Sequence, residues 1–437
     1  MPVIDLLVRG ANVILPEGSR KTSLAIHQGK VVGHAEIEAT TVIDAEGLSL
    51  LPGAFDAHVH YNEPGRTEWE GWGTGSRASR AGGATCVAEM PLNAQPPTLD
   101  AKTFQMKRVI AEKKSCVDFA LWGGITPLNL NKLEELGRAG AIGFKAFMVD
   151  SGTDDFPGSD PATLKEGMKS AARQNLPVAI HAESPKRIAE LTKQIRIQGG
   201  ISAQDYLNSR PIQTEVDAIH LVCELAGETG CRIHIVHVSC PEGIDEIQQA
   251  RKRGVDVTAE TCPHYLVLTE EDMIRIGAPA KCAPPLRSEN ARHGLLQNID
   301  EGKIDTIGSD HSPSPPSLKT DPDFFKVWGG ISGCQHLIPL LFSAGLSPTQ
   351  IARLTSENPA RRFGLYPRKG SLLVGSDADF LLVRTGITYE IRAQDLLTTH
   401  PITPYLGRIL TARVERVAVR GCLEPSRGHF LAPSPSK

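Results

Sequence analysis

The sequence predicts an α/β protein: a (β/α)8 TIM-like barrel with a small β-sandwich domain built from both chain ends. Between residues 53 and 365, short apolar runs alternate with longer stretches of helical spacing, which is the rhythm of parallel strands joined by helices. Eight such runs occur, and eight strands close a barrel, with a doubly wound open sheet as the alternative. Both chain ends instead show short alternating stretches separated by turn residues, which is typical of β-structure.

Each predicted barrel strand is a short apolar run that ends in polar residues. The runs cover residues 53–60, 84–91, 117–126, 141–149, 177–184, 233–239, 256–265 and 304–312. Stretches with helical spacing separate most of them, at residues 100–114, 129–140, 161–175, 213–230 and 242–254. Because strands and helices alternate along the chain, we expect the strands to run parallel with the helices packed outside them.

The two chain ends are assigned to one composite domain. Residues 1–52 and 366–437 are predicted to form the small β-domain, and residues 53–365 the barrel. The N-terminal end contains "DLLVRGANVI", and the C-terminal end repeats this style in "SLLVGSDADFLLVR" and "ARVERVAVRGCLEP". The shared pattern, rather than any spacing rule, is the reason for joining them.

Composition excludes several classes of partner. The chain has 437 residues, and its 47 Lys and Arg against 50 Asp and Glu give a net charge of −3. Nothing in this balance favours nucleic acid or an anionic membrane as a partner, and no apolar run is long enough to span a bilayer. The nine cysteines are scattered without a CxxC pair, so we expect reduced thiols and a cytoplasmic location. The N-terminus lacks the pattern of a signal peptide.

Polar residues of matching type recur where the predicted strands end. The set comprises His58, His60, Lys145, His181, His237 and Asp310. The C-terminal ends of barrel strands meet at one mouth, and an HxH pair on a strand points both imidazoles to one face. A single histidine at a strand end is more often structural than a ligand. Four histidines and an aspartate at one mouth together predict a site for divalent transition metals.

Lys145 is the unusual member of this set. A protonated lysine has three donors and no acceptor, so it cannot bind a metal, and within the apolar run "AIGFKAFMV" an ammonium is costly to bury. The alternative is a snorkelling or ion-paired lysine. Reaction of the neutral amine with carbon dioxide would instead give a carbamate, N6-carboxylysine, with two oxygens able to bridge two cations.

The contexts of these residues resemble the amidohydrolase superfamily, in its cyclic-amidase branch of dihydroorotases, dihydropyrimidinases or hydantoinases, and allantoinases. The similar stretches are "DAHVH", "GFKAF", "HAES", "HVS" and "GSDHSP", and the resemblance covers almost the whole chain. It implies that His58, His60, carbamylated Lys145, His181, His237 and Asp310 hold a binuclear metal centre. Zinc is the expected metal, with Co, Mn and Fe as alternatives, since the ligands suit all four. The resemblance also implies a homotetramer.

The expected chemistry follows from two bridged cations. They would hold a shared water, lower its pKa to give hydroxide, and polarise the scissile carbonyl. Asp310 is the predicted catalytic residue, which takes the proton of the attacking water and delivers it to the leaving ring nitrogen. The substrate would be a small cyclic ureide.

The residues around the ligands favour one group of the branch. Asn62 stands where dihydroorotases carry an arginine for the substrate carboxylate, and Asp150 stands where dihydropyrimidinases carry a tyrosine. Allantoinases are more similar, in "HVHYNEPGRTEWEGW", "MPLNAQPPT", "SGTDDFP" and "WGGISG". This resemblance implies hydrolysis of the hydantoin ring of allantoin to allantoate, in purine catabolism.

Two alternatives to this function remain open, and the substrate contacts are candidates. A dihydropyrimidinase or hydantoinase acting on other cyclic ureides is one alternative, and a non-catalytic scaffold homologue is the other. The candidate substrate contacts are Asn62, Asn93, Ser151, Gly152, Cys282, Ser312 and Gly330. Turn capping is an equally good explanation for Asn93 and Ser312. His264, His311 and Cys262 are expected to be structural.

Overall fold

The computed structural model of the chain describes residues 3–433. Eight parallel strands form the barrel, one of them interrupted at Trp122. Their bounds are β6 (Ala54–Val59), β7 (Ala84–Glu89), β8 (Asp118–Leu121) with β9 (Gly123–Gly124), β10 (Phe144–Phe147), β11 (Val178–His181), β12 (Ile233–Ile235), β13 (Val257–Thr261) and β14 (Thr306–Ile307). All eight predicted strands are present, so the predicted barrel is confirmed.

Hydrogen bonds divide the barrel wall into two parallel parts, β6-β7-β8 and β9 to β14 in sequence order. One seam is covalent, because β8 continues into β9 through Trp122. The other seam is a bridge between Val59 and His311, next to which the His60 N–H donates to the His311 carbonyl at 2.8 Å. The second seam lies at the ends of the first and last strands, where two predicted ligands occur.

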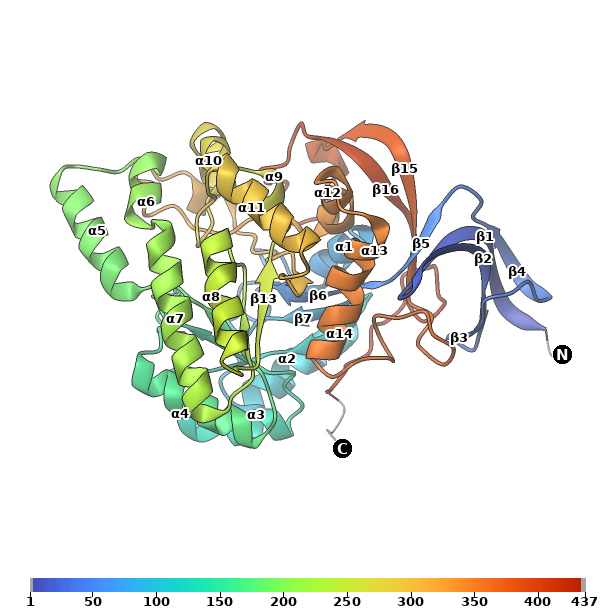
Figure 1. Cartoon of the computed structure of the whole chain (residues 1–437), viewed down its shortest axis with the longest axis horizontal. Coiled ribbons are helices and arrows are strands. Elements are labelled where there is room, and N and C mark those ends of the chain that lie inside the picture. Colours follow the sequence, from blue (N-terminus) through green and yellow to red (C-terminus); the bar gives the residue numbers. More distant parts are fainter. Residues whose placement is uncertain (1–2, 434–437) are drawn as a thin grey trace.

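Helices cover the outside of the barrel (Figure 1). Their bounds are α1 (Trp72–Ala81), α2 (Ala101–Lys114), α3 (Leu133–Arg138), α4 (Pro161–Arg173), α5 (Pro185–Ile197), α6 (Ala203–Ser209), α7 (Ile212–Thr229), α8 (Pro241–Lys252), α9 (Pro263–Val267), α10 (Glu270–Ile276), α11 (Glu289–Asp300), α12 (Leu337–Ser343), α13 (Pro348–Ala352) and α14 (Asn358–Arg362). The five predicted helical stretches correspond to α2, α3, α4, α7 and α8. Their ends follow local chemistry: Asp100 and Asp160 cap α2 and α4 by accepting from Thr103 and Thr163 N–H groups.

The two chain ends form one β-domain, seen as blue and red strands at one side of Figure 1. Its strands are β1 (Ile4–Leu15), β2 (Gly18–His27), β3 (Lys30–Gly33), β4 (Ala39–Asp44), β5 (Ser49–Pro52), β15 (Phe380–Glu390) and β16 (Ile409–Ala418). The order is β16-β15-β5-β1-β2-β3, with β4 beside β1. Because β15 pairs antiparallel with β5, the prediction that both ends build this domain is confirmed. The limits 1–52, 53–365 and 366–437 stay a prediction, and residues 1–2 and 434–437 lie outside the described chain.

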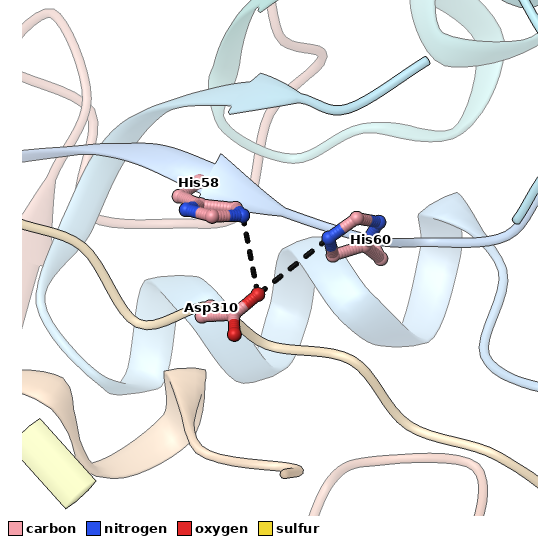
Figure 2. Close-up of side chains that lie close together, drawn as sticks. All are labelled: His58, His60 and Asp310. Carbon is pink, nitrogen blue, oxygen red and sulfur yellow. Dashed lines mark ion pairs between the residues drawn. The ribbon is translucent and has the colours of Figure 1, made fainter. Parts of the chain in front are cut away.

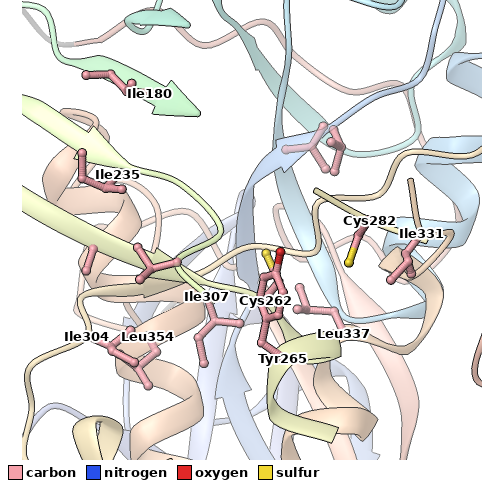
Figure 3. Close-up of a cluster of buried hydrophobic side chains, with 14 of the residues drawn as sticks. Ile180, Ile235, Cys262, Tyr265, Cys282, Ile304, Ile307, Ile331, Leu337 and Leu354 are labelled. Atoms are coloured by element: carbon pink, nitrogen blue, oxygen red, sulfur yellow. The ribbon is translucent and has the colours of Figure 1, made fainter. Parts of the chain in front are cut away.

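The β-domain has a core of its own and also contributes side chains to the main core of the barrel. The β-domain buries its own cluster, including Val8, Leu24, Leu50 and Phe380. The largest cluster fills the space between the barrel strands and the helices outside them. Figure 3 shows part of it, with Ile180, Ile235 and Ile307 on the strands β11, β12 and β14. This packing fixes the strands whose ends carry the polar residues.

A buried charge cluster joins the barrel to the β-domain. Lys369 is fully buried, and its ammonium lies 2.5 Å from Asp118, 2.9 Å from Asp377 and 2.7 Å from Asp379. Asp118 begins barrel strand β8, whereas Asp379 immediately precedes β15. One ammonium thus neutralises carboxylates from both parts of the fold.

Replacement of Lys369 by methionine is expected to lower the free energy of unfolding by about 3–5 kcal/mol, because it leaves the buried Asp379 carboxylate without a cation among the described residues. Urea denaturation monitored by circular dichroism would measure this loss. Lys21→Met is the matched control, since Lys21 is exposed and pairs with Glu46 on the surface. Equal stability of the two variants would contradict the role of Lys369.

Within residues 3–433, none of the helices combines the length and the apolar character that crossing a membrane requires.

Candidate metal centre

The polar strand ends converge as the sequence predicts. His58 lies on β6, His181 ends β11, and Asp310 follows β14. A cavity of about 450 Å³ is lined by five of the six predicted ligands, which are His58, His60, His181, His237 and Asp310. The sixth, Lys145 on β10, is fully buried beside this cavity.

The closest group is His58, His60 and Asp310, shown in Figure 2. Asp310 Oδ1 lies 3.1 Å from His58 Nε2 and 3.6 Å from His60 Nε2. One ligand-type atom from each residue falls within 4.8 Å of the other two. The HxH spacing produces this arrangement, because residues two apart on a strand face the same side. These three side chains could hold a divalent cation between them.

Two further imidazoles extend the group. The ring of His237 lies 4.6 Å from that of His181 and 5.5 Å from that of His58, measured between centroids. Burial lowers the pKa of His60 to about 4 and also lowers the pKa of His181 and His237. Neutral imidazole is the form that binds metals. His237 Nδ1 is buried and lacks a hydrogen-bond partner among the described residues, as expected for a donor atom reserved for a cation.

Lys145 has the surroundings that favour a neutral amine. Its Nζ is buried and makes no hydrogen bond with any residue from 3 to 433, and it lies 4.9 Å from the centroid of the Phe147 ring. Burial lowers the pKa of Lys145 to about 8. An unpaired ammonium at this position is costly, so the structure fits a lysine that reacts with carbon dioxide.

Two buried carboxylates that sequence reasoning missed orient the histidines. His58 Nδ1 donates to Glu260 Oε1 at 2.7 Å, and Glu260 also accepts from His234 at 3.4 Å. His181 Nε2 donates to Glu183 Oε2 at 2.7 Å. Each carboxylate fixes the tautomer, so that His58 Nε2 and His181 Nδ1 remain available to a metal. A carboxylate within an apolar strand, such as Glu260 in "DVTAETCPHY", is the signal that could have found them.

The backbone is strained where the site is built. His237 and Asp310 have φ values of 43° and 45°, and Asn62 and Asn93 have values of 62° and 66°. Residues other than glycine rarely adopt this left-handed region, and such strain collects at functional sites. The chain therefore leaves the strand direction at these points, which turns the side chains of His237 and Asp310 toward the cavity that they line.

Six of the seven candidate substrate contacts line the cavity: Asn93, Ser151, Gly152, Cys282, Ser312 and Gly330. Asn62 is not part of the lining in this structure, and its role in substrate binding stays a prediction. Its side chain is fully buried and its amide donates to the Pro313 carbonyl at 3.2 Å. Asn62 therefore joins the loops after the first and last barrel strands.

The three residues expected to be structural do not line the cavity. His264 is fully buried and is not part of the cavity wall. His311 turns away from Asp310, with its Nδ1 accepting from the Gly333 N–H at 3.3 Å. Cys262 is buried in the barrel core (Figure 3). The cavity is also lined by Arg210, Lys281 and Trp328, which no sequence pattern marked as site residues.

A closed barrel with histidines, a lysine and an aspartate at its C-terminal mouth defines the class of metal-dependent barrel hydrolases. A model described as the Amidohydrolase family matches residues 49–421. The chain belongs to the amidohydrolase family, and the predicted cyclic amidohydrolase is confirmed. The family implies a divalent metal centre, and the His58, His60 and Asp310 group fits one.

The proteins that are similar to this chain include allantoinases and a hydantoinase. An allantoinase of Rubrobacter xylanophilus is 48% identical over 96% of this chain and 94% of that protein. An allantoinase of Solibacter usitatus is 47% identical over 95% of this chain and 93% of its own length. The solved structure of an L-hydantoinase (dihydropyrimidinase) from Arthrobacter aurescens superposes with a TM-score of 0.95 and 32% identity, covering 98% of this chain and 100% of that one.

Proposed function

We propose that this protein is an allantoinase, which hydrolyses a ring amide bond of allantoin to give allantoate. The observation that carries the proposal is the similarity to allantoinases at 47% and 48% identity over nearly the whole chain. The cavity supports it, since a ureide offers several carbonyl and N–H groups and the lining contains Asn93, Ser151 and Ser312.

The proposed cofactor is a pair of divalent cations, with zinc as the first expectation and Co, Mn or Fe as alternatives. His58, His60, His181, His237 and Asp310 would hold them, together with the carbamate of Lys145 as the bridge. When bound, such cations lower the pKa of a water and polarise the carbonyl of the substrate. The unpartnered Lys145 Nζ and His237 Nδ1 atoms support this assignment.

Asp310 is the proposed proton carrier. Its Oδ1 faces His58 and His60, so its second oxygen remains to accept a proton from the attacking water. The same oxygen then donates that proton to the ring nitrogen as the amide bond breaks. Glu260 and Glu183 keep the imidazoles in place during this exchange. The small exposed fraction of the Asp310 side chain, 13%, limits competition from bulk water.

Carbon dioxide should add to Lys145 in the metal-loaded protein. We expect native mass spectrometry to show one additional carbon dioxide per subunit, because the buried amine has a lowered pKa and no protein partner in the described chain. Labelled bicarbonate should give a carbamate signal in the carbon NMR spectrum. Lys145→Ala should lack that signal and bind less metal, and Lys169→Ala, at an exposed position, is the control. An unmodified Lys145 in metal-loaded protein would disprove the carbamate.

A panel of cyclic amides tests the proposed substrate. Purified protein reconstituted with zinc should hydrolyse allantoin faster than hydantoin or dihydrouracil. The alternative function, a hydantoinase or dihydropyrimidinase, is favoured by the TM-score of 0.95 with the L-hydantoinase, and faster turnover of hydantoin or dihydrouracil would support it. A metal content near zero without turnover would support the scaffold alternative.

The homotetramer and the cytoplasmic location remain proposals. All nine cysteines are free in the structure, which supports a reducing compartment. Sedimentation velocity of the purified protein tests the tetramer, and a fluorescent fusion in the source cell tests the location. A monomer, or export from the cytoplasm, would contradict them.

A further inference from the structure

Two lysines that are not proposed metal ligands hydrogen-bond to one wall of the cavity. The wall is the segment 324–330, and every residue of it after Phe324 lines the cavity. Lys281 and Lys319 approach this segment with their ammonium groups. Neither lysine forms an ion pair with a carboxylate within residues 3–433.

Each ammonium has as many carbonyl partners as it has N–H bonds. Lys281 donates to the carbonyls of Phe324, Phe325 and Val327, the first two at 2.6 and 3.2 Å. Lys319 donates to those of Ala278, Trp328 and Gly330 at 3.2, 2.8 and 2.9 Å. Since a protonated lysine has three donors, every N–H of each ammonium can be hydrogen-bonded to a backbone carbonyl.

Lys281 is buried and Lys319 is partly buried, so each ammonium depends on partners within the protein. Lys281 is 4% exposed, and its ammonium also lies 4.7 Å from the ring centroid of Tyr206. Burial lowers the pKa of Lys281 to about 7 and that of Lys319 to about 8. A buried cation without a carboxylate is unfavourable, and here the carbonyl dipoles of the segment offset that cost. The two ammonium groups therefore act by binding the backbone of segment 324–330.

The segment held in this way lies between the loops of the cavity mouth. The ring of Trp328 lies 4.9 Å from that of Trp69, in the loop after β6. On the other side, a Cβ added to Gly152 would lie 3.4 Å from the Trp328 ring. Gly329 is open, since a Cβ there would meet no atom within 4 Å among the described residues. The backbone of the segment is thus accessible to a bound molecule.

We propose that Lys281 and Lys319, here called the lysine clamp, are positioning residues that hold segment 324–330 in the conformation that receives the substrate. The proposal rests on the proposed function, because it takes the ligand of the cavity to be a cyclic ureide. If the wall is already ordered before binding, the binding free energy is not reduced by the entropy cost of ordering it. The clamp therefore acts on substrate binding and not on the metal centre, to which it contributes no ligand.

The test removes each charge while keeping the length of the side chain. Lys319→Met is expected to raise the KM for allantoin about tenfold, with kcat and zinc content close to those of the wild type, because Lys319 does not line the cavity and only ordering of the wall is lost. Lys281→Met, which also changes the lining, is expected to raise the KM at least as much. Trypsin provides a readout without activity. Lys326 is exposed within the segment, and cleavage after it, followed by mass spectrometry, should accelerate about tenfold if the segment opens. Lys169→Met, at an exposed position, should change neither quantity.

The outcomes separate this proposal from the proposed function. Unchanged cleavage at Lys326 in both variants would overturn the lysine clamp, and so would a loss of kcat without a change in KM. Absence of allantoin turnover by the wild type would overturn the proposed function, while the trypsin experiment would still decide on the clamp. Lys319 is only partly buried, so its variant keeps the test valid if Lys281→Met fails to fold.

Discussion

Asp310→Asn is expected to lower kcat for allantoin by about a thousandfold, within the usual range for loss of a general acid–base group. The amide cannot accept the proton of the attacking water, although it has nearly the same shape as the carboxylate. Because the backbone at Asp310 already adopts a φ of 45°, and asparagine tolerates that region, the fold should persist. Steady-state kinetics and circular dichroism would measure both effects.

A surface aspartate provides the control for this experiment. Asp245 is exposed on α8, and Asp245→Asn should retain the kcat of the wild type. Activity of Asp310→Asn within a few-fold of wild type would show that another group carries the proton. Because Asp310 is also a proposed zinc ligand, the zinc content of each variant is measured together with kcat, and rates compared at equal zinc occupancy separate loss of the proton carrier from loss of metal.

Glu260→Gln is expected to weaken zinc binding about 10–100-fold, as loss of a carboxylate behind a metal-binding histidine does. Glu260 is fully buried and accepts hydrogen bonds from both His58 and His234. Burial by itself would raise the pKa of Glu260, but these two histidines bring it down to about 2, so the group is ionised. The neutral amide would release His58 from its tautomer and leave a ring nitrogen unpaired.

Chelator competition with a fluorescent zinc indicator would measure this loss. Glu246 provides a matched control, because it also accepts from a histidine ring, His220 Nδ1 at 2.9 Å, but at the surface. Glu246→Gln should bind zinc like the wild type. Equal zinc affinity in both variants would show that Glu260 has no part in the metal centre.

The sequence was most informative where a local rule applies. Side chains alternate along a strand, so His58 and His60 had to face one side, and they lie together beside Asp310. Because the C-terminal ends of barrel strands meet at one mouth, His181 and His237 were expected to lie together although they are far apart in the sequence. Lys145 was identified by an ammonium placed in an apolar run, and its isolation in the structure agrees with that reasoning.

Contacts between distant segments could not be predicted in the same way. The amide of Asn62 donates to the carbonyl of Pro313, 251 residues further along the chain. Glu260 and His58 are 202 residues apart, and Lys281 meets carbonyls 43 to 46 residues away. No periodicity encodes such pairs, because they depend on how loops pack after the barrel has closed.

The sequence by itself therefore predicted the barrel from its periodicity and the composite β-domain from the shared pattern of the two chain ends. It predicted the ligand set from the polar strand ends together with the resemblance to the amidohydrolase superfamily. The tertiary structure alone decided which carboxylate orients each histidine, which side chains form the cavity wall and which lysines hold it. The physical reason is the range of the interactions. Strand alternation acts over two residues, whereas the buried charges find their partners through the fold.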